Sequence, residues 1–447
     1  MAFDLLAQLG EDPAMVAIFG EDRVIDDWLT VEAEFAHALA DSGLIEAAIA
    51  DRIAAACTTE QIDRTKLWSE MRNVGYPILP LVEQICASLE PAEAAWVHYG
   101  ATTQDIMDSA LALELRDGAA RLIDLTRAFG DRLASHVEEH ATTVMPGRTH
   151  AQQAVPTTLG AKLAILLDQL GRDEVRLRRA AASAATVSLH GAGGTSAALG
   201  EHAAYVRDRL AARLGLATAP IPWHVARDRV TELGLAAAMV SGTCIRFARE
   251  VIDLSRTEVG EVSEVTGHHR GASSTMPQKS NPISCEAIIG FGVSAQASAQ
   301  ALLRALEAGH ERAVGEWQIE WRVVPATMIA TASALAIAAD TAATMQVFPD
   351  RMLTNLDLDG GRLMAEASMI VLARHLGRDV AHEAVYAAVV RSREHNVPLI
   401  EALRDSLPPQ IWEDIANVLP SPEDYLGETS SSSASALQAW RTTDRSD

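Results

Sequence analysis

Apolar residues recur at helical spacing through most of the chain, and polar loops interrupt them at a few points. The first such stripe covers residues 25–45, where apolar side chains return every three or four positions. A longer stripe follows residue 106 and consists of Leu111, Leu115, Leu122, Leu125, Phe129, Leu133 and Val137. A helix of about 30 residues would be roughly 45 Å long at ~1.5 Å per residue. This length predicts the spine of a helical bundle.

Further helical runs are predicted over residues 157–188, 229–262 and 284–309, with shorter helices after residue 350. Strand-like alternation does not persist for long at any point. We therefore predict an all-α fold with three helical domains built around a bundle of long helices. The expected boundaries are 1–109 for an N-terminal domain, 110–350 for the central long-helix bundle and 351–447 for a C-terminal domain.

The charge and cysteine content narrow the possible partners and the compartment. The 447 residues include 37 Lys and Arg against 60 Asp and Glu, a formal net charge of −23, which disfavours nucleic acid as a partner. None of the four cysteines forms a C-x-x-C pair, and the first residues lack the basic start of a signal peptide. The apolar run at 326–345 is interrupted by Asp340, and we interpret it as a buried bundle helix instead of a membrane span. These features predict a cytoplasmic protein.

Three polar loops interrupt the long helices, at residues 98–105, 145–153 and 264–282. The first loop, HYGATTQD, offers His98, Thr102, Thr103 and Gln104, whose hydroxyl, amide and backbone N–H groups suit a carboxylate. The alternative is that its Thr or Asp caps the following helix. Both can hold, because capped helix N-termini also bind anions.

The second and third loops contain groups that can move protons. In GRTHAQQ, Thr149 and Gln153 flank His150, and histidine titrates near neutral pH, although a lone histidine is often structural. The third loop contains SSTMPQKSNP, with Ser273, Lys279 and Asn281. A serine acts as a base only if N–H groups and a cation stabilise its oxyanion. The alternative for this loop is a solvated linker.

Motifs for metals and nucleotides are weak in this sequence. There is no H-E-x-x-H, and the adjacent His268–His269 pair lacks the i, i+4 spacing that places two ligands on one helix face. The glycine-rich stretch at 190–200 lacks the lysine of a phosphate loop and follows no predicted strand. We therefore predict no metal and no cofactor.

The sequence SSTMPQKSNP closely resembles the S-S-x-M-P-x-K-x-N-P signature of the fumarase/aspartase superfamily, and the order of the three loops is also similar. The resemblance covers nearly the whole chain. It implies a homotetramer whose central helices form a twenty-helix core, with each active site shared between three subunits. It also implies cofactor-free chemistry on a small di- or tricarboxylate, in which a base removes the proton beside a carboxylate through an aci-carboxylate intermediate.

The same resemblance implies roles for individual residues. Ser273 matches the general base, and His150 matches a histidine that is a general acid in the adenylosuccinate lyase branch. One departure is Ala272, which stands where glycine usually precedes the serines. The implied substrate-binding residues are His98, Thr102, Thr103, Gln104, Thr149, Gln153, Arg227, Ser274, Met276, Lys279, Asn281 and Arg312.

Within the superfamily, HYGATTQDIMDSA and HERAVGEWQIEWRVVP most resemble bacterial 3-carboxy-cis,cis-muconate cycloisomerases. Adenylosuccinate lyase fits less well, because Asn73, Ser280 and Trp321 occupy positions where it has histidine or arginine. His150 is instead typical of amine-releasing relatives, so a fumarate-releasing lyase on an amino- or nitro-succinate remains the alternative. A catalytically silent structural homologue is disfavoured because both Ser273 and Lys279 are present.

Overall fold

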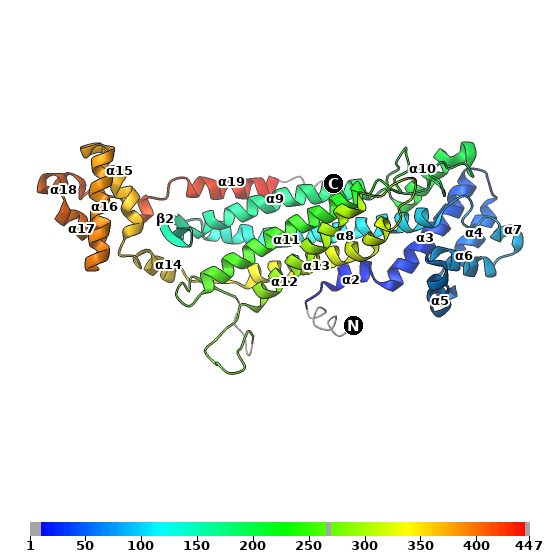
Figure 1. Ribbon diagram of the computed structural model, residues 1–447, viewed down its shortest axis with the longest axis horizontal. Helices are drawn as coiled ribbons and strands as arrows, with labels where there is room; N and C mark the ends of the chain where they lie inside the picture. Colours follow the sequence, from blue (N-terminus) through cyan, green and yellow to red (C-terminus); the bar gives the residue numbers. More distant parts are fainter. Residues whose placement is uncertain (1–9, 265–269, 443–447) are drawn as a thin grey trace. The chain divides into compact units, whose positions relative to one another are not determined.

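Helices dominate the computed structural model, which describes residues 10–264 and 270–442 (Figure 1), so the all-α prediction is confirmed. The His268–His269 pair lies outside the described residues. Close packing divides the chain into two compact units, both discontinuous in sequence, and the predicted division into three consecutive domains stays a prediction. Unit 1 comprises Met1–Arg127, Asp173–Ile245 and Ala287–Ile337, and unit 2 comprises Ala128–Arg172, Arg246–Glu286 and Ala338–Asp447.

Five long helices each contribute residues to both units: α8 (Thr103–Glu139), α9 (Leu159–Ala184), α11 (Asp228–Ser255), α12 (Ile283–Ala305) and α13 (Glu316–Thr344). The predicted spine helix corresponds to α8, which has 37 residues. Its predicted apolar stripe is buried at Leu115, Leu122, Phe129, Leu133 and Val137. The periodicity therefore identified both this helix and the face that it buries.

Unit 1 also contains the shorter helices of the N-terminal region. They are α2 (Pro13–Ile18), α3 (Glu21–Asp41), α4 (Ala47–Ala56), η1 (Thr59–Gln61), α5 (Arg64–Val74), α6 (Ile78–Ala87), α7 (Pro91–Ala94), η2 (Gly200–His202) and α10 (Ala203–Leu214). Helix α3 packs against both α4 and α10 (Figure 1). Phe35, Leu39, Ile53 and Leu210 lie in the apolar core that these helices share with the start of α8. This core anchors the N-terminal end of α8, where the first polar loop enters the helix.

Unit 2 contains two short antiparallel strand pairs and the C-terminal helices. Strand β1 (Val144–Thr149) pairs with β2 (Gln152–Thr158), and β3 (Val262–Ser263) pairs with β4 (Gln346–Val347). The helices are α14 (Pro349–Leu356), η3 (Arg362–Met364), α15 (Ala365–Leu376), α16 (Arg378–His395), α17 (Leu399–Ser406), α18 (Pro409–Ile415), η4 (Pro422–Asp424) and α19 (Thr429–Thr442). Helices α15 to α18 enclose a small core of their own, with Leu372, Ala388 and Leu403 fully buried.

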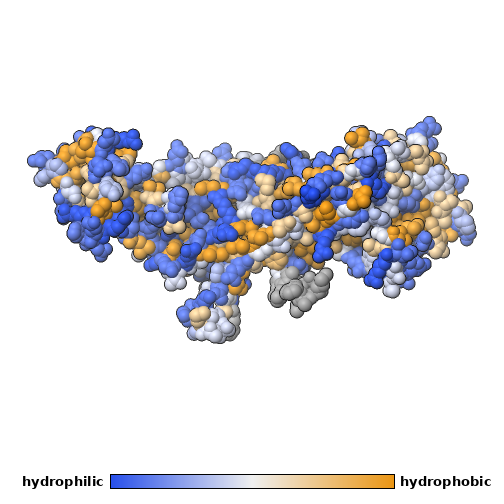
Figure 2. Space-filling model, viewed as in Figure 1, coloured by the Kyte–Doolittle hydropathy of each residue, from blue (hydrophilic) through white to orange (hydrophobic). Residues whose placement is uncertain are grey.

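Two helices, α11 and α13, are long and apolar enough to cross a membrane by length and composition. Their most apolar windows are 61% and 56% buried against the rest of the chain, which is what core helices of a bundle show. The run at 326–345 thus belongs almost entirely to a packed helix, as predicted, and the cytoplasmic location stays a prediction. Apolar residues also reach the surface over the long helices (Figure 2).

Candidate active site

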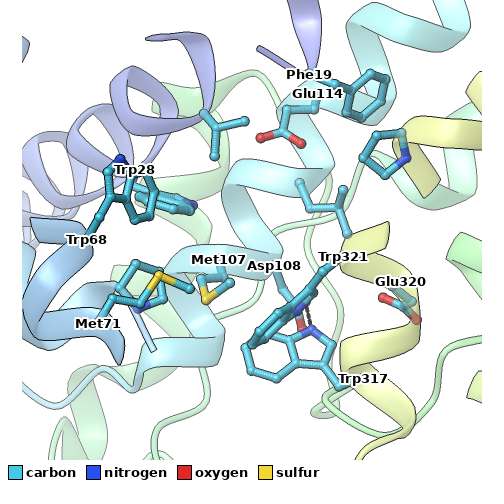
Figure 3. A pocket seen from close by; sticks show the side chains of 14 residues that line it. Phe19, Trp28, Trp68, Met71, Met107, Asp108, Glu114, Trp317, Glu320 and Trp321 are labelled. Carbon is cyan, nitrogen blue, oxygen red and sulfur yellow. Dashed lines mark hydrogen bonds between the residues drawn. The ribbon is translucent and has the colours of Figure 1, made fainter. Parts of the chain in front are cut away.

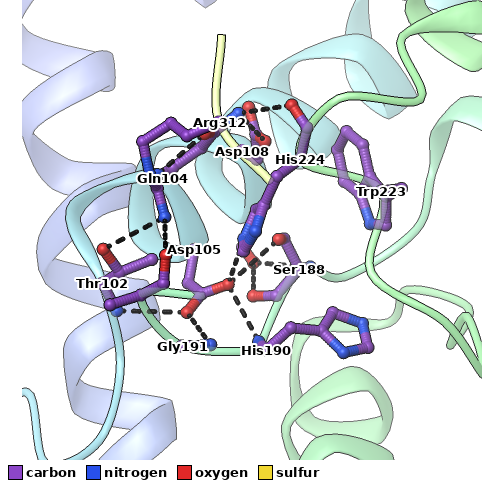
Figure 4. A network of polar contacts seen from close by, with 12 residues as sticks. Thr102, Gln104, Asp105, Asp108, Ser188, His190, Gly191, Trp223, His224 and Arg312 are labelled. Atoms are coloured by element: carbon purple, nitrogen blue, oxygen red, sulfur yellow. Dashed lines mark hydrogen bonds and ion pairs between the residues drawn. The ribbon is translucent and has the colours of Figure 1, made fainter. Parts of the chain in front are cut away.

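The first polar loop is organised around the buried carboxylate of Asp105, near the start of α8 (Figure 4). All of its partners belong to unit 1. One oxygen accepts hydrogen bonds from His224 Nε2 at 2.7 Å, the His190 backbone N–H at 2.9 Å and Ser188 Oγ at 3.1 Å. The other accepts from the Gly191 N–H at 2.8 Å and the Thr102 N–H at 3.1 Å. The last of these bonds is the capping interaction that the sequence offered as an alternative.

The environment of Asp105 keeps its carboxyl ionised. Burial alone would raise the pKa of Asp105, but the hydrogen bond and charge of His224 and the backbone N–H groups of His190 and Gly191 outweigh it. The net pKa therefore lies below the ordinary value. An ionised carboxylate that ties three segments together fixes the backbone from which the neighbouring side chains project.

Gln104 and Arg312 form a second layer over this carboxylate. The fully buried Gln104 amide donates to the His224 carbonyl at 2.9 Å and to Asp108 at 3.1 Å, and its oxygen accepts from Arg312 at 2.8 Å. Arg312 also donates to the Ala192 carbonyl at 2.9 Å. The predicted binders Gln104 and Arg312 are thus brought together, with Thr102 Oγ1 at the limit of hydrogen-bond distance from Arg312, 3.5 Å. Thr103 is the first residue of α8, beside Thr102.

Arg227 lies deeper, in a buried ion-pair cluster. Its guanidinium donates two bonds to Asp108, at 2.7 and 3.0 Å, and one to Glu320 at 2.8 Å, with a further short contact to Glu320. Its face lies 4.9 Å from the ring of Trp223. Burial would lower the pKa of Arg227, but the two carboxylates raise it, so the group stays cationic. Only 1% of Arg227 is exposed, which leaves little room for a direct contact with substrate.

His98 lies at the start of the same loop and pairs with Glu32 on α3. The Nδ1 atom of His98 is 2.6 Å from Glu32 Oε1, and the residue has a positive φ of 58°. Burial lowers the pKa of His98, but the charge of Glu32 and the hydrogen bond to it raise it more, so the net pKa lies above the ordinary value. The pairing favours a cationic imidazole, which suits an anionic ligand.

An aromatic cavity of about 250 Å³ adjoins this cluster (Figure 3). Trp28, Trp68, Trp317 and Trp321 line it, together with Asp108, Glu320 and Glu114. Glu114 is only 6% exposed, and its carboxyl makes no hydrogen bond among the described residues. Burial, with a smaller contribution from the charge of Asp27, raises its pKa to about 8. The Glu114 carboxyl is therefore mostly protonated at neutral pH.

The second loop forms the β1–β2 hairpin of unit 2. His150 and Ala151 are its two turn residues, with φ of 51° and 62°, as a type I′ turn requires. Thr149 and His150 are exposed at the tip, and the His150 ring makes no hydrogen bond to any described residue. The hairpin thus presents a predicted proton-transfer group on a short, defined turn.

The base of the hairpin is held by polar contacts within unit 2. Arg148 donates to both oxygens of the fully buried Glu261, at 2.6 and 2.9 Å. Asn355 donates to Glu261 at 2.7 Å, and Gln153 donates to the Asn355 carbonyl at 2.8 Å. Gln153, predicted to bind substrate, is therefore already engaged through its N–H₂ group, while its buried Oε1 atom has no partner in the described part of the chain.

The third loop, described from residue 270 onward, projects from the helices that flank it (Figure 1). Ser273 Oγ accepts hydrogen bonds from the backbone N–H groups of Met276 at 3.1 Å and Thr275 at 3.3 Å. Ser273 is half-buried, whereas Ser274, Met276 and Lys279 are exposed. The two N–H donors meet one of the conditions for a basic serine, namely support for negative charge on Oγ.

A short bridge closes the base of this loop. The N–H of Asn281 donates to the Gly271 carbonyl at 2.8 Å, and Ala272 pairs with Ser280 in antiparallel register. Ser273 directly follows and Lys279 directly precedes this bridge pair along the chain. Gly271 has a φ of 66°, and a Cβ there would lie 2.5 Å from the Asn281 carbonyl oxygen, so only glycine fits. Ala272, which stands where glycine usually precedes the serines, is not subject to this steric limit, because the limit applies to Gly271.

The structure also contains site residues that the sequence analysis missed. Asp108, Glu320, Glu32 and His224 hold the predicted binders in place, yet none was singled out. A usable signal was the i, i+3 spacing of Asp105 and Asp108 on the buried start of α8, because paired buried carboxylates require cationic partners. Apart from Thr102 and Gln104, their hydrogen-bond partners lie 83 to 209 positions away in sequence, which no local pattern could reveal.

Comparisons with known proteins agree with this picture. A family model described as Lyase matches residues 9–297. The 3-carboxy-cis,cis-muconate cycloisomerase of Pseudomonas aeruginosa is 39% identical over 422 residues, covering 93% of this chain and 91% of that protein. Trans-aconitate decarboxylase 1 of Mycosarcoma maydis is 35% identical over 427 residues, covering 95% and 87%. The crystal structure of 3-carboxy-cis,cis-muconate lactonizing enzyme from Pseudomonas putida matches with a TM-score of 0.92 at 34% identity, covering 98% of this chain and 99% of that one.

Proposed function

Because the chain belongs to the fumarase/aspartase superfamily of lyases, we propose that it acts as a cycloisomerase of the 3-carboxy-cis,cis-muconate type. In that reaction a carboxylate oxygen of the substrate attacks a double bond of the same molecule and closes a lactone ring. A C–O bond forms at one carbon, and the neighbouring carbon, beside another carboxylate, takes up a proton. The reverse reaction removes that proton and opens the ring.

Ser273 is the group that carries this proton in the proposal. The main observation in support of the proposal is that two backbone N–H groups donate to Ser273 Oγ, inside a loop that matches the superfamily signature. These donors stabilise the alkoxide that takes a proton, and in the lactone-forming direction the neutral hydroxyl gives the proton to carbon. Lys279, from the other side of the Ala272–Ser280 bridge, adds positive charge in the proposal.

The aci-carboxylate intermediate carries two negative charges next to the reacting carbon, so its donors decide the rate. In the proposal Lys279 and Asn281 bind one carboxylate, with Ser274 and Met276 beside them. Thr102, Thr103, Gln104 and Arg312 bind another carboxylate, and His98 adds charge to that group. Thr149 and Gln153 line the site from the hairpin. Arg227 positions Asp108 and the α8 start, because its donors are already occupied.

The assembly in the proposal is a homotetramer with shared active sites. The first-loop residues belong to unit 1, whereas the second-loop and third-loop residues belong to unit 2. The hydrogen bonds described above stay within each of these groups. Loops from three subunits would then complete one site, as the resemblance implies.

The test of the activity is an ultraviolet and proton-NMR time course with 3-carboxy-cis,cis-muconate. Loss of diene absorbance together with lactone signals supports the proposal, and no turnover under any condition contradicts it. Ser273→Ala should reduce kcat by at least ~10³-fold. Ser280→Ala, an exposed serine of the same loop, is the matched control and should leave kcat nearly unchanged.

Shared sites can be tested by mixing two inactive variants. Ser273→Ala alters the third loop, and Arg312→Ala alters the first-loop network. If one site takes these loops from different subunits, co-refolded mixed tetramers contain some sites with both loops intact and regain activity. Mixtures that stay as inactive as each variant alone would show that a single subunit supplies both loops. Light scattering gives the oligomeric state in parallel.

A second candidate function is supported by His150. A histidine at the tip of the hairpin, exposed and free of described partners, suits protonation of a nitrogen leaving group. The corresponding reaction releases fumarate from an amino- or nitro-substituted succinate. His150→Asn distinguishes the two. A loss of kcat of about 10²-fold or more with a succinyl compound supports proton transfer, whereas a small change with the muconate indicates a positioning role.

A further inference from the structure

Three side chains that can bind metals occur in the order His-x-x-Glu-His at the C-terminal end of α8: His136 and Glu139 on the helix, and His140 directly after it. Residues three and four positions apart lie on the same helix face. The order is the reverse of H-E-x-x-H, and it gives the same pair of histidines one turn apart. All three residues belong to unit 2, and the proposed reaction uses none of them.

The geometry of this cluster is close to that of a metal site. One potential ligand atom from each residue lies within 4.8 Å of the other two. The two imidazole rings are stacked, with centroids 5.8 Å apart and planes 13° apart. In a tetrahedral zinc site with Zn–N bonds of ~2.0–2.1 Å the ligand atoms are roughly 3.4 Å apart. The exposed Glu139 side chain can cover the remaining distance by a rotamer change.

In each histidine one ring nitrogen makes a hydrogen bond, and the other nitrogen can offer a lone pair to a metal ion. His136 Nε2 lies 2.7 Å from the Ala342 carbonyl oxygen, which can only accept, so this nitrogen carries the proton. The Nδ1 atom of His136 then has a lone pair, and it is buried without a partner among the described residues. His140 Nδ1 lies 3.1 Å from Thr143 Oγ1, and in the tautomer in which Nδ1 donates to this hydroxyl, Nε2 keeps its lone pair. Such outer hydrogen bonds are a regular feature of metal-binding histidines.

The surrounding charges also favour a cation. Glu139 makes no ion pair to any residue in the described ranges, so its charge is uncompensated. Its neighbour Glu138 is paired with Arg441 at 2.7 Å, so that this arginine is already bound to another carboxylate. A buried imidazole lone pair without a donor is costly, and an ion satisfies it.

We propose that His136, Glu139 and His140 bind one divalent transition-metal ion, for which Zn²⁺ is the best match. Two imidazole nitrogens and one carboxylate oxygen are ligands that Zn²⁺ takes, with water completing the coordination. The ion connects His140, whose ring contacts Thr143 just before β1, with His136, whose ring contacts the end of α13. Its role is to stiffen the junction between α8 and the β1–β2 hairpin.

The experiment uses full-length protein without a histidine tag, freed of metal by a chelator. Calorimetric titration with ZnCl₂ should give one site per chain, and Co²⁺ should give the visible absorption of a low-coordinate complex. His136→Gln and His140→Gln should each weaken zinc binding at least ~10-fold, and Glu139→Gln somewhat less. His395→Gln, an exposed histidine of α16, is the matched control and should bind as the unaltered chain does.

A second readout is thermal stability, which rises when an ion binds only the folded state. Saturating Zn²⁺ should raise the melting temperature of the unaltered chain by a few degrees, and leave that of His136→Gln unchanged. A dissociation constant for Zn²⁺ weaker than roughly 100 µM, or equal binding by the three variants, would overturn the proposal. If His140→Gln does not fold, the variants at the half-buried His136 and the exposed Glu139 decide the matter.

Discussion

Two buried carboxyl groups on α8 have opposite environments. Asp105 accepts five hydrogen bonds, and these hold its pKa below the ordinary value. Glu114 lies nine positions later on the same helix, has no hydrogen bond to a described residue, and has a pKa raised to about 8. The two residues show that burial itself does not set the protonation state of a carboxyl. The partners that the fold supplies decide whether the charge is kept or lost.

The difference also separates two kinds of surroundings. The Asp105 network joins α8 to the loops that precede α10 and α11 and fixes residues predicted to bind substrate. The Glu114 cavity is lined mainly by apolar side chains, among them four tryptophans, and carries an acidic proton at neutral pH. The Asp105 network is expected to lose stability when one partner is removed, whereas the contribution of Glu114 to stability is expected to change mainly with pH. Each of the four variants or measurements below tests one side of this contrast.

The largest effect is expected for Asp105→Asn. The amide loses the negative charge that His224 and two backbone N–H groups require, and its N–H₂ group faces donors. Breaking such a buried pair costs about 3–5 kcal/mol of unfolding free energy, which urea denaturation at pH 7 measures. Asp124→Asn, an exposed position of the same helix, is the control and should shift stability by less than ~0.5 kcal/mol. An equally small change for Asp105→Asn would show that the network contributes little.

The next effect is expected for Arg227→Lys. A lysine ammonium cannot bond Asp108 and Glu320 with the two-sided geometry of the guanidinium, so one carboxylate loses its partner. The expected loss is about 2–4 kcal/mol of unfolding free energy, with a lower kcat/KM because the α8 start shifts. Arg229→Lys, two positions later and half-buried, controls for the chemical change. If Arg227 binds substrate directly, KM should rise with stability unchanged.

The third prediction concerns pH and Glu114. Its pKa is about 8 when folded and 4.5 as the ordinary value, so between these limits the folded state holds a proton that the unfolded state has lost. Stability from this group is therefore fully present below pH 4.5 and is lost as pH rises through 8, by about 1.4 kcal/mol per pH unit. Asp105, with its lowered pKa, acts in the opposite sense and loses stability only as the pH falls into the acid range.

Urea denaturation of the unaltered chain and of Glu114→Gln at several pH values isolates this contribution. The variant should lack the slope, so the two stability curves should diverge by roughly 2–3 kcal/mol between pH 5 and pH 7. Subtraction is needed because burial also raises the pKa of Asp27, to about 6, despite its pairing with Arg23. Parallel curves would mean that Glu114 ionises normally in the folded chain.

The sequence predicted the helices well because their signal is local. The stripe from Leu115 to Val137 repeats every three to four residues, and the structure buries it in one helix. The β1–β2 hairpin was not predicted, because Pro146, Gly147 and Pro156 occupy strand positions where alternation would be expected. The pairing is held instead by a two-residue turn and by contacts of Arg148 with Glu261, far away in sequence.

In the candidate site, too, features that depend on neighbouring residues could be predicted from the sequence, whereas features that depend on distant residues could not. The signature around Ser273 is contiguous, and its N–H donors come from residues two and three positions later, so a motif could identify it. The supports of the first loop come from α3, α13 and the loop before α11. The site assignments themselves stay predictions until variants are assayed. The cluster of His136, Glu139 and His140 was not singled out, because only H-E-x-x-H and the adjacent His268–His269 pair were considered as metal motifs, and the prediction of no metal stays a prediction.

The smallest expected effect compares two tryptophans of the aromatic cavity, Trp317 and Trp321, one turn apart on α13. The indole N–H of Trp317 donates to Asp108 at 3.2 Å, whereas the buried N–H of Trp321 has no partner among the described residues. Replacement by phenylalanine removes a similar apolar area at both positions, since both rings line the cavity. The difference between the two variants therefore reports the hydrogen bond of Trp317 together with the unpartnered N–H of Trp321. We expect Trp317→Phe to cost about 1 kcal/mol more unfolding free energy than Trp321→Phe, because only the former removes a hydrogen bond. Equal losses in urea denaturation would mean that Asp108 is fully satisfied by Arg227 and Gln104, and that the network and the cavity are energetically independent.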